Sequence, residues 1–420
     1  MKFRVQSLCT ENPLRVLPGG GPPWPLTLQD GLRIHSRPGS ATCRVAKRLL
    51  PGAAPVPLHA TPAAYSRVPK RTTKRPYADV DRRAVALLTV LLLAGLGSLP
   101  SAAAQDSLYH ESRPAMATTV QIYLFAPGRD RAAALLEEAY EEIERVEAAL
   151  STYRPTSEVS RLNATAAREP VITDPEVFAL IEQALEFSRL TSGAFDVTVG
   201  PLVKAWGFFR GQGRRPSAAE LSEALASVGW EHMALDEAHR SVHFRRAGLE
   251  LNLGGIGKGF ALDCAARTLR RLGVEGALLG AGHSSYVAIG APPGAKGWPI
   301  TVPSPDDPAR AMSTVPLRDA SLSTSGSNQQ YFELDGRRYS HILDPRTGQP
   351  VTGMIQVTVT APTATESDAL STALFVLGPE RAAPLIEGLP ETAALLVADR
   401  EPESRVVAIR WPEAYTPRAR

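Results

Sequence analysis

Hydrophobic and polar residues follow two distinct periods over residues 105–420. Residues 118–125 alternate apolar and polar positions as a half-buried strand does, and residues 129–150 repeat alanine, leucine and glutamate at the spacing of an amphipathic helix. The helical period returns at residues 175–191, 260–272, 364–377 and 380–387. Short apolar or alternating runs predict strands at residues 277–279, 286–289, 321–324, 331–334, 354–360 and 393–398. There is no internal repeat, and the mixture predicts an α+β fold.

The densest group of reactive side chains lies in residues 340–348 (SHILDPRTG). The apolar pair Ile342 and Leu343 predicts the buried end of a strand, and the Asp-Pro and Thr-Gly steps predict a turn that follows it. Such positions often carry binding and catalytic groups. A plain turn, in which Asp344 caps backbone amides and His341 is a hydrogen-bonded core residue, explains the same residues equally well.

Residues 251–260 (LNLGGIGKGF) place four glycines and Lys258 at a predicted strand-to-helix junction. Glycines let backbone amides approach an anion, while the helix N-terminus and the lysine add positive charge. The segment is not a P-loop, because Gly259 follows the lysine where Ser or Thr is required, and its glycine spacing is not that of a dinucleotide-binding fold. A tight turn packed against its neighbour is the alternative, but the lysine favours a phosphate site.

Asp368 and Thr372 are four residues apart in the predicted helix 364–377, so both project from one face. A carboxylate, a hydroxyl, a backbone carbonyl and phosphate oxygens form a ligand set that suits Mg²⁺ better than zinc, which prefers His and Cys. A solvated helix face is the alternative. Apolar residues on either side of the pair favour the edge of a cleft.

Two serine-rich runs, at residues 282–285 (GHSS) and 322–327 (LSTSGS), invite comparison with a serine nucleophile. The first run is followed by Tyr286, where a nucleophile elbow has its closing glycine. We therefore expect both runs to form ligand contacts or plain turns.

Charge and cysteine are distributed unevenly along the chain. The first 104 residues hold 15 of the 46 Lys and Arg residues and 4 of the 43 Asp and Glu residues, which leaves 31 basic against 39 acidic side chains in residues 105–420. An acidic body argues against nucleic-acid binding. Cys264 is the one cysteine of this body, so no disulfide can form within it, and its apolar core must supply its stability.

Residues 80–104 predict a secretory signal peptide. Asp81-Arg82-Arg83 precedes an apolar run at residues 84–99, and the small residues 100–104 offer a cleavage site near Ala104. A transmembrane anchor is disfavoured because the run is short and contains Thr89, two glycines and Ser98. We expect export to the periplasm or cell envelope, without lipid attachment, since no cysteine follows the apolar run.

Residues 1–79 are rich in Pro, Arg and Gly and show no apolar periodicity. Because a signal peptide belongs at the N-terminus, our hypothesis is that this segment is an over-extended reading frame and that translation starts near Val80 or Val85. A disordered basic extension is the alternative. On either interpretation, residues 105–420 form the folded catalytic body.

Seven short motifs, in sequence order, resemble those of the ApbE family of FAD:protein FMN transferases. They are MAT at residues 116–118, STY at 151–153, GAFD at 193–196, NLGGIGKG at 252–259, STSG at 323–326, HILDPRTG at 341–348 and DALST at 368–372. The resemblance covers nearly all of residues 114–400. It implies a two-lobed α+β fold, related to the T-fold, with mixed sheets and with FAD in a cleft between the lobes.

The resemblance also implies a reaction: Mg²⁺-dependent transfer of FMN from FAD to a Thr hydroxyl of an acceptor protein, with release of AMP. It assigns His341 as the base that activates the acceptor. The FAD-contacting positions would be Met116, Ala194, Phe195, Asp196, Asn252, Lys258 and Leu343. The Mg²⁺ ligands would be Asp368 and Thr372, with Ser371 and the backbone near Gly255 as further candidates.

This chemistry is physically coherent. A Thr hydroxyl is a weak nucleophile that a neutral imidazole can activate, and Mg²⁺ together with Lys258 can neutralise the pyrophosphate and the departing AMP oxygen. The acceptor would be an exported flavoprotein or a subunit of a redox complex, and the latter would bring the enzyme near a membrane.

Two positions depart from the family pattern. Asn252 stands where the family usually has Asp, and GAGHS at residues 280–284, with His283, stands where many members have Gly-Gly-Asp, so contacts to FAD can differ there. Two other functions fit the same residues: Mg²⁺-dependent hydrolysis of FAD to FMN and AMP, and an exported flavin-binding protein without enzymatic activity.

Overall fold

The computed structural model describes residues 106–415 apart from residues 212, 306, 308–309 and 400–403, together with the short strand β1 (Arg15–Val16). The predictions for residues 1–79 and for the signal peptide at 80–104 therefore lie, apart from β1, outside the described residues. Among the helices that the structure describes, none is long and apolar enough to cross a membrane.

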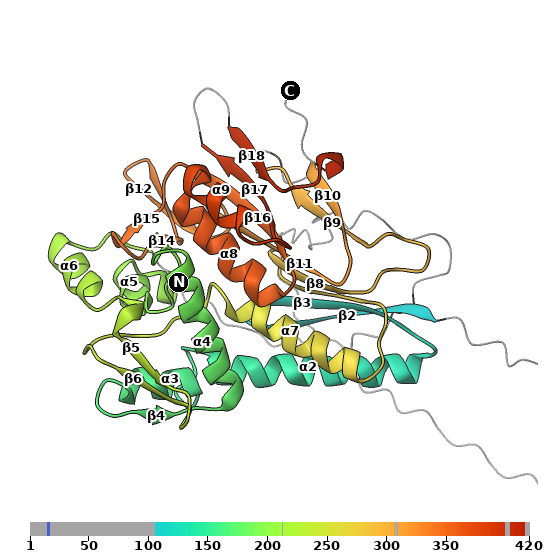
Figure 1. Cartoon of the computed structure of the whole chain (residues 1–420), viewed down its shortest axis with the longest axis horizontal. Helices are drawn as coiled ribbons and strands as arrows, with labels where there is room; N and C mark the ends of the chain where they lie inside the picture. Colours follow the sequence, from blue (N-terminus) through green and yellow to red (C-terminus); the bar gives the residue numbers. More distant parts are fainter. Residues whose placement is uncertain are drawn as a thin grey trace, which may run out of the picture. The chain divides into compact units, whose positions relative to one another are not determined.

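One large antiparallel sheet organises the fold (Figure 1). Its strand order is β1-β2-β3-β7-β8-β11-β16-β17-β18. The strands after β1 are β2 (Ser107–Ala115), β3 (Thr118–Ala126), β7 (Ala277–Ala281), β8 (Ser285–Ile289), β11 (Ser321–Gly326), β16 (Met354–Ala361), β17 (Ala393–Ala398) and β18 (Arg405–Ile409). In β3 the alternation predicted from sequence is realised, because Val120, Ile122 and Leu124 are buried while the intervening residues are not.

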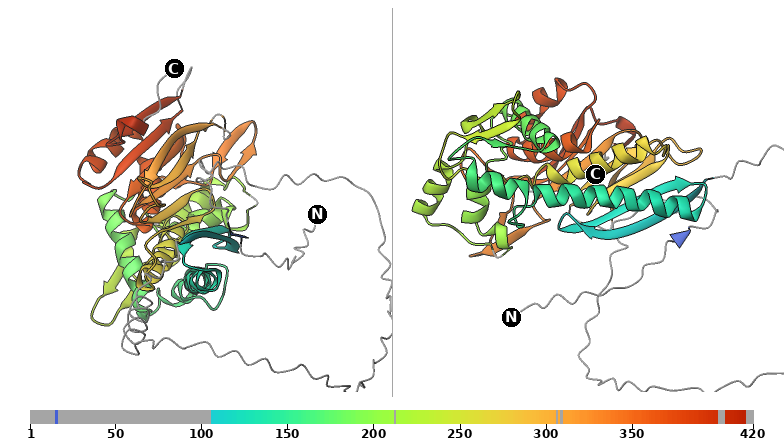
Figure 2. Two further views of the ribbon diagram at one scale, coloured as in Figure 1. Left: turned by 90° about the vertical axis from the view of Figure 1, so that its right-hand side faces the viewer. Right: turned by 90° about the horizontal axis from the view of Figure 1, so that it is seen from below.

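Helices cover one face of this sheet. They are α2 (Arg129–Leu150), α7 (Gly257–Arg271), α8 (Ala364–Leu377) and α9 (Pro379–Glu387). Figure 2 shows α2 and α7 lying side by side along the face, and α8 packs on β11 and β16. The crossing of α7 and α8 is close: a Cβ atom added to Gly259 would lie 2.1 Å from the carbonyl oxygen of Ala364. Only glycine fits at that point.

Smaller elements surround the large sheet. The segment between α2 and α7 contains α3 (Glu158–Thr165), α4 (Pro175–Leu190), α5 (Gly200–Ala205), η1 (Phe208–Arg210), α6 (Ala218–Ala226), η2 (Trp230–His232) and a sheet of β4 (Val171–Ile172), β6 (Ser241–Phe244) and β5 (Met233–Asp236). Three two-stranded hairpins and a last turn follow later in the chain: β9 (Trp298–Pro303) with β10 (Ala311–Leu317), β12 (Tyr331–Leu334) with β13 (Arg337–Ser340), β14 (Leu343–Asp344) with β15 (Gln349–Pro350), and η3 (Glu413–Tyr415).

The structure confirms the α+β class and the helices and strands predicted from periodicity, with one shift and one error. The helix predicted at residues 260–272 begins three residues earlier, so Lys258 lies within its first turn. The strand expected before the glycine-rich segment does not form; residues 251–253 are irregular, although Glu250 bridges Val199. Most of the serine-rich run at residues 322–327 lies in β11 and is buried there, which confirms the strand predicted at residues 321–324 and excludes a plain turn for this run.

Candidate active site

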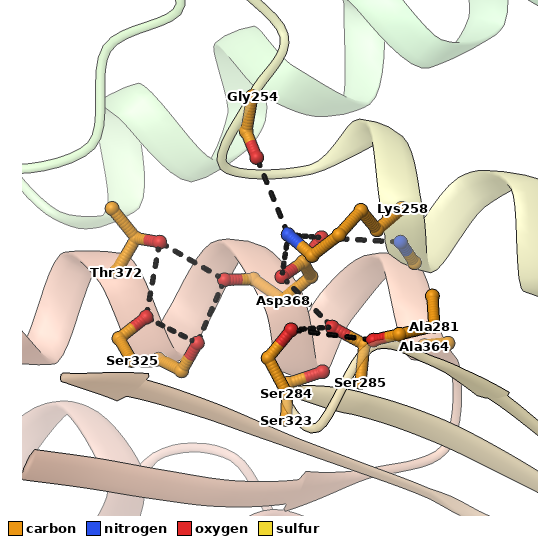
Figure 3. Close-up of polar contacts among 12 residues, drawn as sticks. Gly254, Lys258, Ala281, Ser284, Ser285, Ser323, Ser325, Ala364, Asp368 and Thr372 are labelled. Atoms are coloured by element: carbon orange, nitrogen blue, oxygen red, sulfur yellow. Dashed lines mark hydrogen bonds and ion pairs between the residues drawn. The ribbon is translucent and has the colours of Figure 1, made fainter. Parts of the chain in front are cut away.

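The site is built around Asp368, whose side chain is buried in α8. Its Oδ2 atom accepts a hydrogen bond from the backbone N–H of Gly259 at 3.1 Å, and its Oδ1 atom accepts one from the hydroxyl of Ser285 at 3.3 Å. The Nζ atom of Lys258 lies 3.3 Å and 3.4 Å from the two carboxylate oxygens and 3.5 Å from the carbonyl oxygen of Gly254 (Figure 3). The predicted phosphate-binding lysine and the predicted metal ligand are therefore direct neighbours.

A row of hydroxyl groups, which we call the hydroxyl seam, joins β11 to α8. It consists of Ser321, Ser323 and Ser325 of β11 with Ser367, Ser371 and Thr372 of α8. Each strand serine has a hydroxyl partner on the helix at 2.9 Å. Alternate residues of a strand lie on one face of the sheet, and residues four apart lie on one face of a helix. The seam therefore fixes the rotation of α8 about its own axis, and with it the direction in which Asp368 projects.

The start of α8 is held by Asp263 of α7, a residue that the sequence reasoning missed. Its carboxylate accepts hydrogen bonds from the backbone N–H groups of Ala364 and Thr365 at 2.9 Å and 2.8 Å, and from the hydroxyl of Thr365 at 2.6 Å. Burial raises the pKa of Asp263. A signal was present in the sequence: a carboxylate four residues after Gly259 lies on the same, otherwise apolar, face of the helix.

The oxygen atoms around Asp368 fit a hard cation. A Cβ atom on Gly255 would lie 3.3 Å from the Thr372 hydroxyl, so the backbone of the glycine-rich turn comes close to that side chain. Carboxylate, hydroxyl and backbone oxygens are the ligands that Mg²⁺ prefers. Ser371, the remaining candidate ligand, is fully buried, and its hydroxyl bonds to Ser325 and to the backbone oxygen of Asp368.

His341 lies directly after β13 and is half-buried. Its Nδ1 atom is 2.9 Å from the carbonyl oxygen of Gln330. Because a carbonyl oxygen only accepts, Nδ1 carries the proton, and Nε2 is left as the acceptor. Burial lowers the pKa of His341, the hydrogen bond to Gln330 opposes this effect, and the positive charge of Lys258 lowers the pKa further. The geometry therefore favours a neutral imidazole with an available Nε2.

The rest of the 340–348 segment is a scaffold. Arg346 donates to both carboxylate oxygens of Asp344 at 2.8 Å through Nε and a terminal guanidinium nitrogen, and its backbone N–H donates to Oδ1 at 3.0 Å. Leu343 is buried in a small cluster with Trp206 and Tyr339. Ile342 and Leu343 are buried, and the turn between β14 and β15 follows them, as predicted.

Met116 and Phe195, which are far apart in the sequence, both lie beside the glycine-rich turn. Met116 occupies the two-residue turn between β2 and β3 with φ of 54°, and its backbone N–H donates to Glu147 at 2.9 Å. Its Cε atom would lie 3.8 Å from a Cβ on Gly257, and a ring carbon of Phe195 would lie 3.3 Å from a Cβ on Gly255. These two predicted FAD contacts are therefore neighbours of the turn that leads to Lys258.

The remaining predicted FAD contacts have partners within the protein. Asp196 accepts from the backbone N–H and hydroxyl of Thr198 at 2.8 Å and 2.7 Å and from the backbone N–H of Trp230 at 3.0 Å, and burial raises its pKa. Ala194, two residues earlier in the sequence, is buried. Asn252 accepts from the backbone N–H of Gly254 at 3.0 Å, so the amide that replaces the family's usual Asp still shapes the turn.

The second departure from the family pattern forms the turn between β7 and β8. Gly282 has a φ of +60°, and a Cβ atom there would lie 2.7 Å from the Thr118 hydroxyl. His283 is exposed, whereas Ser285, two residues later, is buried against Asp368. The residue that follows the unusual GAGHS sequence, Ser285, is therefore part of the site.

Two hollows adjoin these residues. One, of about 280 Å³, is lined by residues that include Asn252, Thr152, Lys204 and Phe209. The other, of about 830 Å³, is open and lies between the Met116 turn and α2; its lining includes Ala117 and Glu147. The smaller hollow is lined by Asn252, a predicted FAD-contacting residue, and the larger one is lined by the neighbours of Met116 in the sequence, Ala115 and Ala117.

The chain matches known proteins over most of the described residues. A sequence model of the ApbE family matches residues 116–396. The FAD:protein FMN transferase of Vibrio cholerae is 35% identical over 311 residues, which cover 71% of this chain and 88% of the relative. The FAD:protein FMN transferase of Treponema pallidum is 33% identical over 336 residues, which cover 76% and 91%.

Solved structures show the same fold. The ApbE protein of Thermotoga maritima matches with a TM-score of 0.67 at 32% identity, covering 72% of this chain and 97% of that protein. The flavinyl transferase ApbE of Pseudomonas stutzeri, in its apo form, matches with a TM-score of 0.65 at 33% identity, covering 73% and 96%.

Proposed function

Because this chain belongs to the ApbE family, we propose that it transfers FMN from FAD to a Thr hydroxyl of an acceptor protein, with Mg²⁺ as cofactor and AMP as the second product. One observation carries the proposal beyond family membership. Lys258 and Asp368 form an ion pair at the glycine-rich turn. Burial, together with the positive charge of Lys258, lowers the pKa of His341, which favours a neutral imidazole. These observations support a site in which Lys258 binds phosphate, Asp368 binds the metal and His341 acts as the base.

His341 supplies the proton acceptor. Its Nδ1 proton is engaged by Gln330, so Nε2 can take the proton of an acceptor hydroxyl as the oxygen attacks the phosphorus atom of the FMN half. The new bond joins the Thr oxygen to phosphorus, and the bond from phosphorus to the AMP oxygen breaks. The electron pair of the broken bond stays on the AMP oxygen, and the proton of the Thr hydroxyl stays on Nε2 of His341.

Lys258 and a bound Mg²⁺ would offset the negative charge of the pyrophosphate. Lys258 can place its ammonium group on a phosphate oxygen and stabilise the departing AMP oxygen. Asp368, Thr372 and the backbone near Gly255 would hold Mg²⁺, which when bound neutralises the pyrophosphate. Met116 and Phe195 lie where they can position FAD.

We further propose that the protein is exported and that its signal peptide is cleaved near Ala104. An exported enzyme would meet acceptors that are exported flavoproteins or subunits of a redox complex at the membrane. The acidic balance of residues 105–420 supports a protein partner over a nucleic acid.

The test is a single incubation of the protein with FAD, MgCl₂ and an acceptor protein that carries a Thr flavinylation motif. Intact-mass spectrometry measures FMN attached to the acceptor, and chromatography measures free nucleotides. Covalent FMN with equimolar AMP supports the proposal. Free FMN and AMP without a modified acceptor would indicate hydrolysis, and unchanged FAD would indicate flavin storage; either result would overturn it.

Asp368→Ala sharpens this experiment. Removing the carboxylate takes away the charged metal ligand, so Mg²⁺-dependent turnover should fall to background while the protein stays folded. Full activity of this variant would contradict the assignment of Asp368.

A further inference from the structure

We propose that Lys258 and Mg²⁺ compete for the carboxylate of Asp368, so that FAD and Mg²⁺ bind cooperatively because the pyrophosphate draws Lys258 away from that carboxylate. This inference rests on the proposed function and concerns the regulation of the same site. It makes Lys258 the physical link between two ligands.

The carboxylate has two kinds of partner. The backbone N–H of Gly259 and the hydroxyl of Ser285 belong to rigid elements and contact different oxygens, at 3.1 Å and 3.3 Å. Lys258 instead spans both oxygens with one ammonium group, at 3.3 Å and 3.4 Å. Its ammonium group therefore lies against both carboxylate oxygens, whereas each fixed donor contacts one (Figure 3).

Lys258 is the partner that can move. Its contacts with Asp368 are longer than the 2.7–2.9 Å or so that is typical of a strong charge-assisted hydrogen bond, and its remaining contact is the Gly254 carbonyl oxygen at 3.5 Å. About a quarter of its side chain is exposed, 24%, compared with 6% for Asp368. A lysine has a flexible four-carbon stem, so its ammonium group can turn to a nearby anion while the carboxylate stays in place.

Two cations at one carboxylate repel each other. A lysine and a divalent ion about 4 Å apart are unfavourable by roughly 2 kcal/mol even with the screening of water, which corresponds to a factor of about 30 in affinity. A pyrophosphate that binds the lysine relieves this repulsion. Since coupling between two ligands is reciprocal, Mg²⁺ must strengthen FAD binding by the same factor by which FAD strengthens Mg²⁺ binding.

The experiment measures Mg²⁺ binding to the full-length protein by calorimetric titration with MgCl₂ alone. Lys258→Met should bind Mg²⁺ more tightly than wild type, by roughly tenfold or more, which is the opposite of what loss of an ordinary site residue would do. Lys258→Arg keeps the charge and should show no gain. Lys296→Met removes a lysine from an exposed loop and controls for net charge; it should also show no gain.

A second measurement follows FAD affinity through flavin fluorescence, with EDTA and then with MgCl₂, while chromatography confirms that FAD stays intact. The enhancement of FAD binding by Mg²⁺ should be smaller in Lys258→Met than in wild type, by about the factor gained in the first measurement. Unchanged or weaker Mg²⁺ binding by folded Lys258→Met would overturn the inference and leave the proposed function standing. Wild-type protein that binds neither FAD nor Mg²⁺ would overturn both.

Discussion

At the scale of single residues, hydrogen bonds decide which form of a side chain is present. Both the backbone N–H and Nδ1 of His341 point to one oxygen, the carbonyl of Gln330, at 3.1 Å and 2.9 Å. This pair of contacts sets the ring orientation and the tautomer together. The nearby charge of Lys258 then works with burial to lower the pKa and keep the ring neutral.

The pH dependence of transfer should reflect this imidazole. A base acts only when unprotonated, so activity should rise with pH through the pKa of His341 and be level above it. Because that pKa lies below the ordinary value of about 6.5, the acidic limb of the kcat/KM profile should fall below neutral pH. His341→Ala should slow transfer by about 100-fold or more, retain FAD binding and lack the acidic limb; an unchanged limb in this variant would exclude His341 as the base.

Backbone strain is visible at another residue of the site. Ala117 follows Met116 in the turn between β2 and β3, and both have positive φ values, 57° and 54°. Such a turn usually contains Asn and Gly, because a positive φ strains most other residues. The turn persists because β2 and β3 pair on both sides of it and Glu147 anchors Met116.

Ala117→Gly should therefore stabilise the protein. Relief of the positive φ outweighs the greater flexibility of glycine in the unfolded chain, so the free energy of unfolding should rise by about 1 kcal/mol. Urea denaturation measures the change. Ala115→Gly, the same substitution two residues earlier within β2, should destabilise the protein; equal effects of the two changes would show that strain at residue 117 is not the cause.

At the scale of elements, α8 is positioned by two independent attachments. Asp263 of α7 holds its first turn, and the hydroxyl seam holds its side against β11. Ser285 of β8 adds a direct contact to Asp368. Polar contacts in a buried interface give α8 one rotation, whereas an apolar interface would tolerate several.

Two serine substitutions should distinguish residues that only stabilise the packing of α8 from residues that also position the carboxylate of Asp368. Ser285 and Ser323 are both fully buried, and each donates or shares a hydrogen bond with α8. Ser285→Ala and Ser323→Ala should each lower the free energy of unfolding by about 1–2 kcal/mol. Only Ser285→Ala should also weaken Mg²⁺ binding, by about tenfold. Calorimetry with MgCl₂ and thermal unfolding give both quantities; equal Mg²⁺ affinities would mean that Ser285 has no positioning role.

At the scale of the whole molecule, the pairing of the first strands bears on whether residues 105–420 fold by themselves. β2 pairs with β3 along all nine of its residues, whereas β1 contributes only a two-residue pairing on the other edge of β2. The core described above is formed by residues beyond 106. We therefore expect residues 105–420 to fold without the segment that precedes them.

A chain that begins at Gln105 should keep full transferase activity and a melting temperature within a few degrees of that of the full chain. N-terminal sequencing of the protein from its host should find Gln105 or a near neighbour, as expected for cleavage near Ala104. A peptide from residues 1–79 in the cellular precursor would show that this segment is translated. If the shortened chain failed to fold, the N-terminal segment would have a structural role.

The sequence by itself determined the elements whose patterns are local. The helices predicted at residues 129–150 and 364–377 have those bounds in the structure, because an apolar stripe at helical spacing needs no knowledge of its partner. The Asp-Pro and Thr-Gly steps likewise predicted the turn after Leu343. Candidate chemistry at Lys258, His341 and Asp368 was visible from residue type and spacing.

Only the tertiary structure decided how those groups meet. Lys258 and Asp368 are 110 residues apart, and their ion pair depends on the close crossing of α7 and α8 at Gly259. The roles of Asp263 and Ser285, and the proton on Nδ1 of His341, likewise depend on partners brought by other elements. Hydrophobic periodicity shows which side of a helix or strand is buried. Strand order and helix crossing determine which residues of other elements face that side. Both depend on the packing of the whole chain, which the local pattern does not contain.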